Sequence, residues 1–207
     1  MRALRILKRF LPLLALPLAA GCEDIFGSGG DRVAEDRLTF IRAAADAPPL
    51  SAQSVTLWAK PGATRRATIS YVGVPHYQHD LCMEFTVPAG ALVRRPDGTP
   101  VQAGDSVQIT VRVVDAARFI FQFEPSGLRF AAGNPAKLRV SYWWADRDYN
   151  GDGVVDRLDT GISDRFGLWR QEREGEPWSR LQTSRFADVQ EVTTDVPGFT
   201  RYAVASN

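Results

Sequence analysis

The sequence has few of the residues that most often carry chemistry. Among its 207 residues there are two histidines, His76 and His79, and two cysteines, Cys22 and Cys82. No Ser-His-Asp arrangement stands out, and the glycine-rich run GSGG precedes no helix–strand unit of the kind that binds phosphate. General base catalysis therefore has few candidates. We expect a protein that is not an enzyme and has no catalytic residues.

The two histidines and Cys82 follow one another at three-residue intervals, a spacing that on a helix would hint at a zinc site. Pro75 and the alternating segment LCMEFTV instead place them in a loop that enters a strand, where this spacing does not bring side chains together reliably. We interpret Cys82 as a buried, unreactive thiol. If Cys22 is lipidated, Cys82 has no partner for a disulfide within the chain.

The chain has no net positive charge once residues 1–21 are set aside. The whole chain has 25 basic and 24 acidic residues, but residues 1–21 carry four of the basic residues and no acid. The remainder has 21 basic and 24 acidic residues, a net charge of −3, with no block of lysine and arginine. This composition argues against a nucleic acid partner.

The apolar run from Phe10 to Ala20 is too short to be a good membrane span. Four basic residues precede it, which predicts a helical signal peptide over residues 1–21. The sequence LAAGC at its end resembles the bacterial lipobox, although leucine stands one residue before its favoured place. The resemblance implies that Cys22 is lipidated and becomes the first mature residue. Ordinary cleavage after Ala20 or Gly21 is the alternative.

A lipidated Cys22 would attach the exported chain to a membrane without a spanning helix, because each buried CH₂ contributes about 0.8 kcal/mol. The polar, glycine-rich residues 22–36 predict a flexible tether. Glu23, by resemblance to enterobacterial sorting signals, favours the outer membrane. We expect a lipid-anchored protein of the cell envelope, at the outer membrane or a periplasm-facing membrane.

Helical periodicity is rare, and beyond the signal peptide it extends to one turn near RLTFIRAAADA. Most of residues 37–207 consists of short alternating runs separated by turns that contain proline or glycine. This pattern predicts an all-β fold, an antiparallel β-sandwich with about ten short strands. The expected strands are residues 54–59, 66–73, 82–88, 105–115, 118–125, 137–145, 167–172, 178–183, 191–196 and 201–206.

Three segments carry a family resemblance: FTVPAGAL (85–92), FEPSGLRFAAGNPAKLRVSYW (123–143) and VTTDVPGFTRYAVA (192–205). In this order they resemble the ZU-five-type β-sandwich domain of zonula occludens proteins, ankyrins and netrin receptors, in a divergent bacterial lipoprotein form. The resemblance covers about residues 82–205. It implies a binding or scaffolding module with a protein partner that the sequence does not name.

Some members of that family cleave themselves at a His-Phe-Ser motif near the last strand. The matching residues here are Gly198, Phe199 and Thr200. The hydroxyl of Thr200 has the chemistry of a nucleophile, but Gly198 replaces the histidine that would activate it. We therefore expect no self-cleavage.

The acidic stretch ADRDYNGDGVVDRLDTG follows the run KLRVSYWWA and has the order of a twelve-residue calcium loop over residues 148–159. Calcium prefers six to eight oxygen ligands, and Gly153 stands at the sixth position, where the loop must turn. The ligands at positions one, three, five, seven, nine and twelve would be Asp148, Asn150, Asp152, the carbonyl of Val154, Asp156 and Asp159.

The surroundings of this loop differ from those of a calcium sensor. The preceding run reads as a strand, the following GISDRFGLW reads as a turn and a strand, and a sensor needs two flanking helices. The loop also resembles that of dockerins, which carry a duplicated pair, whereas this chain has one. We expect weak structural binding of Ca²⁺, in the range of about 10⁻⁴–10⁻³ M. A solvated turn without metal is the alternative.

Two neighbouring tryptophans, Trp143 and Trp144, precede the acidic loop and point to opposite faces if their segment is a strand. An outward tryptophan there would suit a glycan. The main expectation is a calcium-binding, membrane-anchored interaction module of the cell envelope, and the alternative is a carbohydrate-binding envelope protein that uses these aromatic residues.

Overall fold

The computed structural model describes residues 32–75 and 79–207. The expected signal peptide, Cys22, most of the expected tether and His76 lie outside the described residues. Within the described part the chain forms β-strands, one short α-helix and one turn of 3₁₀ helix, η1 (Glu35–Arg37). No helix of this part has the length and apolar character needed to cross a bilayer.

The larger sheet of the described part has eight strands, and neighbouring strands are antiparallel. Its order is β1-β12-β11-β15-β8-β7-β3, and β2 pairs with the end of β15. These strands are β1 (Arg32–Val33), β2 (Thr39–Phe40), β3 (Ser54–Ala59), β7 (Val107–Asp115), β8 (Ile120–Glu124), β11 (Gly167–Gln171), β12 (Trp178–Arg180) and β15 (Arg201–Ser206).

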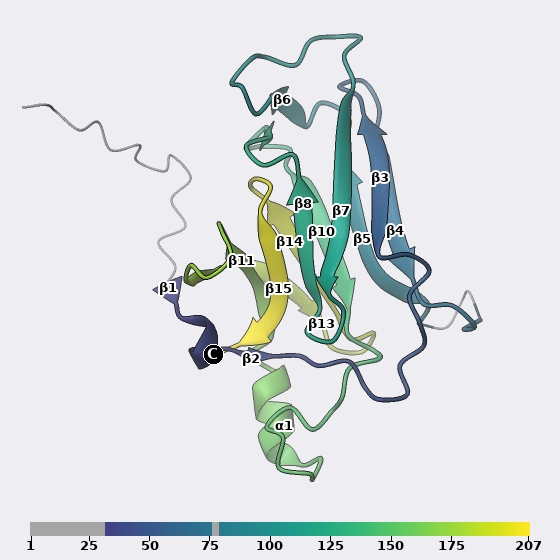
Figure 1. Cartoon of the computed structure of the whole chain (residues 1–207), viewed down its shortest axis with the longest axis vertical. Coiled ribbons are helices and arrows are strands. Elements are labelled where there is room, and N and C mark those ends of the chain that lie inside the picture. Colours follow the sequence, from purple (N-terminus) through teal and green to yellow (C-terminus); the bar gives the residue numbers. More distant parts are fainter. Residues whose placement is uncertain (1–31, 76–78) are drawn as a thin grey trace, which may run out of the picture.

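The second sheet has five strands in the order β13-β14-β10-β5-β4, again antiparallel. Two short strands, β6 and β9, pair separately at one end of the molecule (Figure 1). These strands are β4 (Arg65–Ser70), β5 (Leu81–Val87), β6 (Leu92–Arg94), β9 (Arg129–Phe130), β10 (Ala136–Ser141), β13 (Thr183–Phe186) and β14 (Glu191–Val196).

The two large sheets pack face to face around one aromatic-rich core. The ring of Phe85 on β5 lies 5.0 Å from that of Phe123 on β8, which joins the sheets directly. Phe199, which precedes β15, packs against both rings at 5.6 and 5.5 Å. Tilted and edge-on pairs of this kind add to the stabilisation from buried area. The expected antiparallel β-sandwich is confirmed.

The strands form where apolar and polar residues alternate. In β7, Val107, Ile109 and Val111 are buried while Gln108 and Arg112 are exposed, as a period of two requires. The expected strands 54–59, 191–196 and 201–206 match β3, β14 and β15 at both ends. The other expected strands correspond to β4, β5, β7, β8, β10, β11 and β12, with ends that differ by up to four residues.

The outer face of the larger sheet is covered over part of its area by the N-terminal strap, which we define as residues 32–40. The strap includes β1, η1 and β2, and its apolar side chains complete a second hydrophobic cluster. Trp169 and Trp178 are almost fully buried in this cluster. Its members are Val33, Leu38, Phe40, Ile120, Trp169, Trp178, Ala203 and Ala205.

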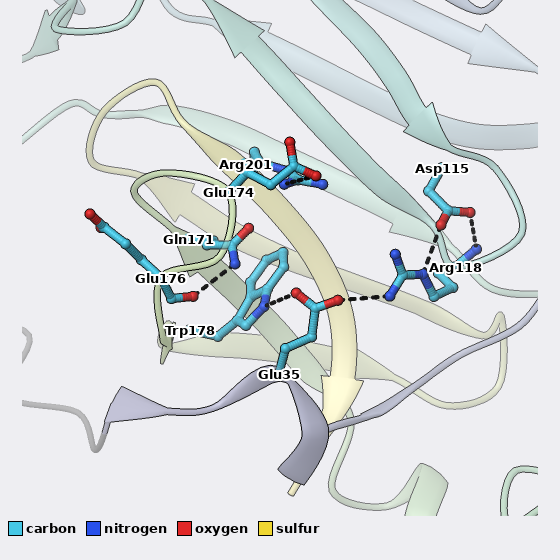
Figure 2. Close-up of polar contacts among 8 residues, drawn as sticks. All are labelled: Glu35, Asp115, Arg118, Gln171, Glu174, Glu176, Trp178 and Arg201. Carbon is cyan, nitrogen blue, oxygen red and sulfur yellow. Dashed lines mark hydrogen bonds and ion pairs between the residues drawn. The ribbon is translucent and has the colours of Figure 1, made fainter.

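A polar network fixes the strap to the sheet, and Figure 2 shows its contacts. Glu35 accepts a hydrogen bond from Nε1 of Trp178 at 3.3 Å and pairs with Arg118 at 2.8 Å. Arg118 also pairs with Asp115 at 2.7 Å. Burial alone would raise the pKa of Glu35, but the hydrogen bonds from Arg118 and Trp178 outweigh it and lower the pKa. Residues 32–36 of the expected tether are therefore folded against the sheet.

Candidate metal centre in the acidic loop

The acidic loop joins β10 to the α-helix α1 (Arg157–Ser163), which projects from the sandwich at the lower end of Figure 1. Its entrance is held by the segment after the strap: Ala145 forms a β-bridge with Ala43, and the N–H of Asp146 donates to the carbonyl of Arg42 at 2.7 Å. The sandwich therefore holds this end of the loop, while most of the loop is in solvent.

Asp148, at the first ligand position, organises the turn. Its Oδ1 accepts hydrogen bonds from the N–H groups of Gly151 and Asp152 at 2.8 and 3.1 Å, and its Oδ2 accepts one from Gly153 at 2.7 Å. Gly151 and Gly153 have φ angles of 75° and 86°, a conformation that favours glycine. These two glycines let the backbone fold around the carboxylate of Asp148.

The third and fifth positions interact with each other. Asn150 donates from its amide to Oδ2 of Asp152 at 2.9 Å, and its own Oδ1 accepts from the N–H of Asp152 at 2.9 Å. Oδ1 of Asp152 accepts from the N–H of Val154, also at 2.9 Å. The two side chains are thus ordered within the loop, and the N–H of Val154, at the seventh position, is held by Asp152.

The ninth and twelfth positions start α1 through a capping box. Oδ1 of Asp156 accepts from the N–H of Leu158 at 2.7 Å, and Oδ2 of Asp159 accepts from the N–H of Asp156 at 2.9 Å. This helix corrects our expectation of a turn and a strand after the loop. The sequence signal for this helix is an acceptor followed three residues later by a second acceptor, a pattern that also fits two metal ligands.

Asp159 links the two halves of the loop. Its other oxygen, Oδ1, accepts from the N–H of Asn150 at 3.1 Å, and its side chain is almost completely shielded, with the residue 2% exposed. Hydrogen bonds from the backbone of Asp156 and Asn150 favour the ionised form and lower the pKa of Asp159. The last ligand position therefore closes the loop and keeps a negative charge inside it.

These side chains match calcium in the type and order of their donors, but they do not form a ready cluster. Among residues 32–75 and 79–207, no three side chains of aspartate, glutamate, histidine or cysteine lie close enough together to hold a metal ion. Their oxygens accept backbone N–H groups instead. An ion would require Asp148, Asp152 and Asp159 to converge, starting from positions already within one loop.

The other candidate ligands are placed apart in the described residues. The ring of His79 stacks on Trp143 with centroids 3.3 Å apart, and the carbonyl of His79 accepts a hydrogen bond from Nε1 of Trp144 at 2.9 Å. Cys82 is buried and faces Tyr71. Burial raises the pKa of the Cys82 thiol to about 12, which keeps the thiol protonated at neutral pH.

Both tryptophans beside the loop are half-buried. Trp143 has one ring face against His79, and Trp144 packs against the main core. The exposed tryptophan of the described part is Trp58 on β3, with 55% of its surface in solvent. The sequence contains a signal for this exposure, because Trp58 falls on the outward phase of the alternating run SVTLWA.

Thr200, the residue that matches the nucleophile of self-cleaving domains, is buried beside a cation. Its Oγ1 accepts a hydrogen bond from Nε of Arg170 at 3.3 Å. A guanidinium stays protonated and does not act as a base. Gly198, at the position of the histidine, contributes its carbonyl to the hydroxyl of Tyr202.

Comparisons with protein-family models, curated proteins and solved structures find no match for this chain. The class is therefore defined by the fold, an all-β antiparallel sandwich with one acidic loop and one short helix at its end.

Proposed function

We propose that the protein is a calcium-binding, non-enzymatic interaction module of the cell envelope, anchored to a membrane through lipidated Cys22. The calcium proposal depends chiefly on one observation: Asp159 is buried and accepts from the backbone N–H groups of Asn150 and Asp156, so the twelfth position lies beside the third and the ninth. An ion would draw Asp148 and Asp152 toward Asp159, starting from positions that already lie within one loop.

Electrostatics supplies the reason for an ion. Residues 146–159 contain five aspartates and two arginines within fourteen positions. Carboxylates at such spacing repel one another, and a divalent cation would neutralise them. Asp148 and Asp159 would hold the ion from the two ends of the loop, and Asp152 would hold it from the middle. The ion would then fix α1 against the sandwich, which is a structural role.

Calorimetric titration of the purified full chain with calcium tests the proposal. We expect one bound ion per chain, with a dissociation constant in the range of about 10⁻⁴–10⁻³ M, and weaker binding of magnesium. Asp148→Asn should weaken calcium binding at least tenfold. Asp97→Asn is the matched control, because Asp97 also accepts a backbone N–H, from Thr99 at 2.9 Å, but lies outside the loop. An absence of binding at millimolar calcium would exclude a calcium site.

The anchor and the partner are tested separately. Intact-mass analysis of the exported protein should show acyl chains on Cys22, and Cys22→Ser should abolish both the added mass and the recovery in membranes. The ZU-five-like resemblance supports a protein partner, which we expect to be captured by the wild-type chain in calcium. Recovery of the same proteins with the Asp148→Asn variant would show that the loop does not contribute to the interaction.

A further inference from the structure

The outer face of the larger sheet is covered unevenly. The N-terminal strap shields Trp169 and Trp178, whereas the other end of the same face, formed by β3 and β7, has no such cover in the described residues. There Trp58 stands opposite Gln108 with 55% of its surface in solvent. An indole ring exposed to this extent stabilises the fold less than a buried one would. Trp58 is thus a candidate contact for a ligand.

A shallow hollow of about 640 Å³ adjoins this tryptophan. It is lined by Trp58, Lys60, Arg65 and Ser106, which come from β3, the turn after it, β4 and the segment before β7. The hollow therefore has one aromatic ring, two cationic side chains and one hydroxyl. Aromatic and polar groups that converge in a concavity are typical of small-molecule sites.

The two cations in the hollow lack partners. Within residues 32–75 and 79–207, neither Lys60 nor Arg65 forms a side-chain hydrogen bond or an ion pair. The next residue, Arg66, pairs with Glu84 at 3.3 Å, and Lys137 pairs with Asp195 at 3.0 Å. The positive charge of the hollow is consequently available to an anion.

The strip of sheet beside the hollow is polar. Thr56 lies two residues before Trp58 on the outward face, and its hydroxyl meets that of Thr110 at 3.1 Å. Gln108 is exposed next to Trp58 on the neighbouring strand. Such a strip offers donors and acceptors to a ligand rich in hydroxyl groups, and it offers little to an acyl chain.

We propose that Trp58, Lys60 and Arg65 form a binding site for an acidic saccharide, meaning a sugar chain whose rings carry carboxylate groups. The apolar C–H face of a sugar ring would pack on the indole of Trp58. The carboxylates would pair with Lys60 and Arg65, and the ring hydroxyls would meet Ser106 and the polar strip. This site is independent of the acidic loop, so its test does not depend on calcium.

Polygalacturonate is a suitable probe, because it repeats one carboxylate on each pyranose ring. We expect the full chain to bind it, and to bind neutral dextran at least tenfold more weakly. Trp58→Ala should reduce the affinity at least tenfold. Lys60→Gln with Arg65→Gln should do the same and should reduce the dependence of the affinity on salt. Because all three residues are exposed, the melting temperature should not change appreciably.

Two controls separate this site from general attraction of polyanions. Arg112→Gln removes an exposed cation from the same face of the sheet, and it should leave binding unchanged. Poly-glutamate has carboxylates without sugar rings, and it should bind weakly and with no effect of Trp58→Ala. The proposal is overturned if polygalacturonate does not bind, if poly-glutamate binds as tightly, or if a single-stranded oligonucleotide binds more tightly through the same residues.

Discussion

The attachment of the N-terminal strap makes a sharp prediction for Trp178. This side chain is 0% exposed, its ring lies 5.5 Å from that of Phe40 in an edge-on arrangement, and its Nε1 donates to Glu35. Trp178→Ala removes one of the two tryptophan side chains that the strap covers. Truncations of this kind cost about 3–5 kcal/mol. For a chain of this length the melting temperature should fall by roughly 6–20 °C.

A second substitution separates the ring from its hydrogen bond. Trp178→Phe keeps an aromatic ring against Phe40 but removes the N–H, while Glu35 remains paired with Arg118. We expect a loss of about 1 kcal/mol, which corresponds to roughly 2–4 °C. Trp58→Ala is the control, because it makes the same truncation as Trp178→Ala at an exposed tryptophan. It should change the free energy of unfolding by no more than about 0.5 kcal/mol.

The assay combines thermal unfolding with limited trypsin cleavage after Arg37, which is exposed on the strap. In Trp178→Ala the strap should detach more often, so cleavage at Arg37 should become faster while the core strands stay resistant. The reasoning is refuted if Trp178→Ala melts within 2 °C of the wild type, or if cleavage at Arg37 keeps its original rate.

Three further predictions follow from the described contacts. Gly153→Ala places a side chain at a φ of 86° and should cost about 1–2 kcal/mol, seen as a lower denaturant midpoint, whereas Gly62→Ala, which has open space around it, should be close to neutral. In a Cys22→Ser background, iodoacetamide at pH 8 should modify Cys82 only as the protein unfolds, because burial raises the pKa of its thiol to about 12; rapid modification of the folded protein would contradict this. Glu35 and Asp115 both have pKa values that are lowered by folding, so their contribution to the free energy of unfolding is present above the unfolded pKa of about 4 and is lost as the pH falls through the folded pKa. Glu35→Gln with Asp115→Asn should therefore make the free energy of unfolding fall less steeply in acid. An unchanged slope against pH would contradict this prediction.

The strands were predictable where one face is buried and the other is in water. In β14 the buried positions recur at a period of two, and in β15 four apolar residues, Tyr202 to Ala205, are buried in one run, so these patterns predict both strands. The two-residue strands β1 and β2 have no such period, because they are too short to show one. They exist because tertiary packing on Trp178 and Ala205 holds them against the sheet.

The helix α1 was missed for a different reason. Its seven residues contain Thr160 and Gly161, which are poor helix formers, and they show no amphipathic stripe. The capping box of Asp156 and Asp159 provides the start, and the same residues also fit ligand positions nine and twelve. Asp156 and Asp159 therefore fit both a helix start and two metal ligands, and our prediction from the sequence covers only the ligands.

The exposure of Trp58 to solvent also depends on tertiary structure. Alternation placed Trp58 on the outward face, but whether another segment covers that face is decided by where the strap lies. The strap covers the β11–β12 end, held there by Glu35 and Trp178, and leaves β3 open. The course of such a segment is fixed by contacts between residues more than a hundred positions apart.

The measurement that tests the calcium loop most directly is thermal unfolding of the full chain in 10 mM calcium and in excess chelator. With a dissociation constant of about 10⁻⁴–10⁻³ M, 10 mM calcium stabilises the folded state by about 1.4–2.7 kcal/mol. The melting temperature should then rise by roughly 3–10 °C, and Asp148→Asn should remove the rise. Equal melting temperatures with calcium and with chelator, or an equal rise in Asp148→Asn, would contradict a calcium-binding loop.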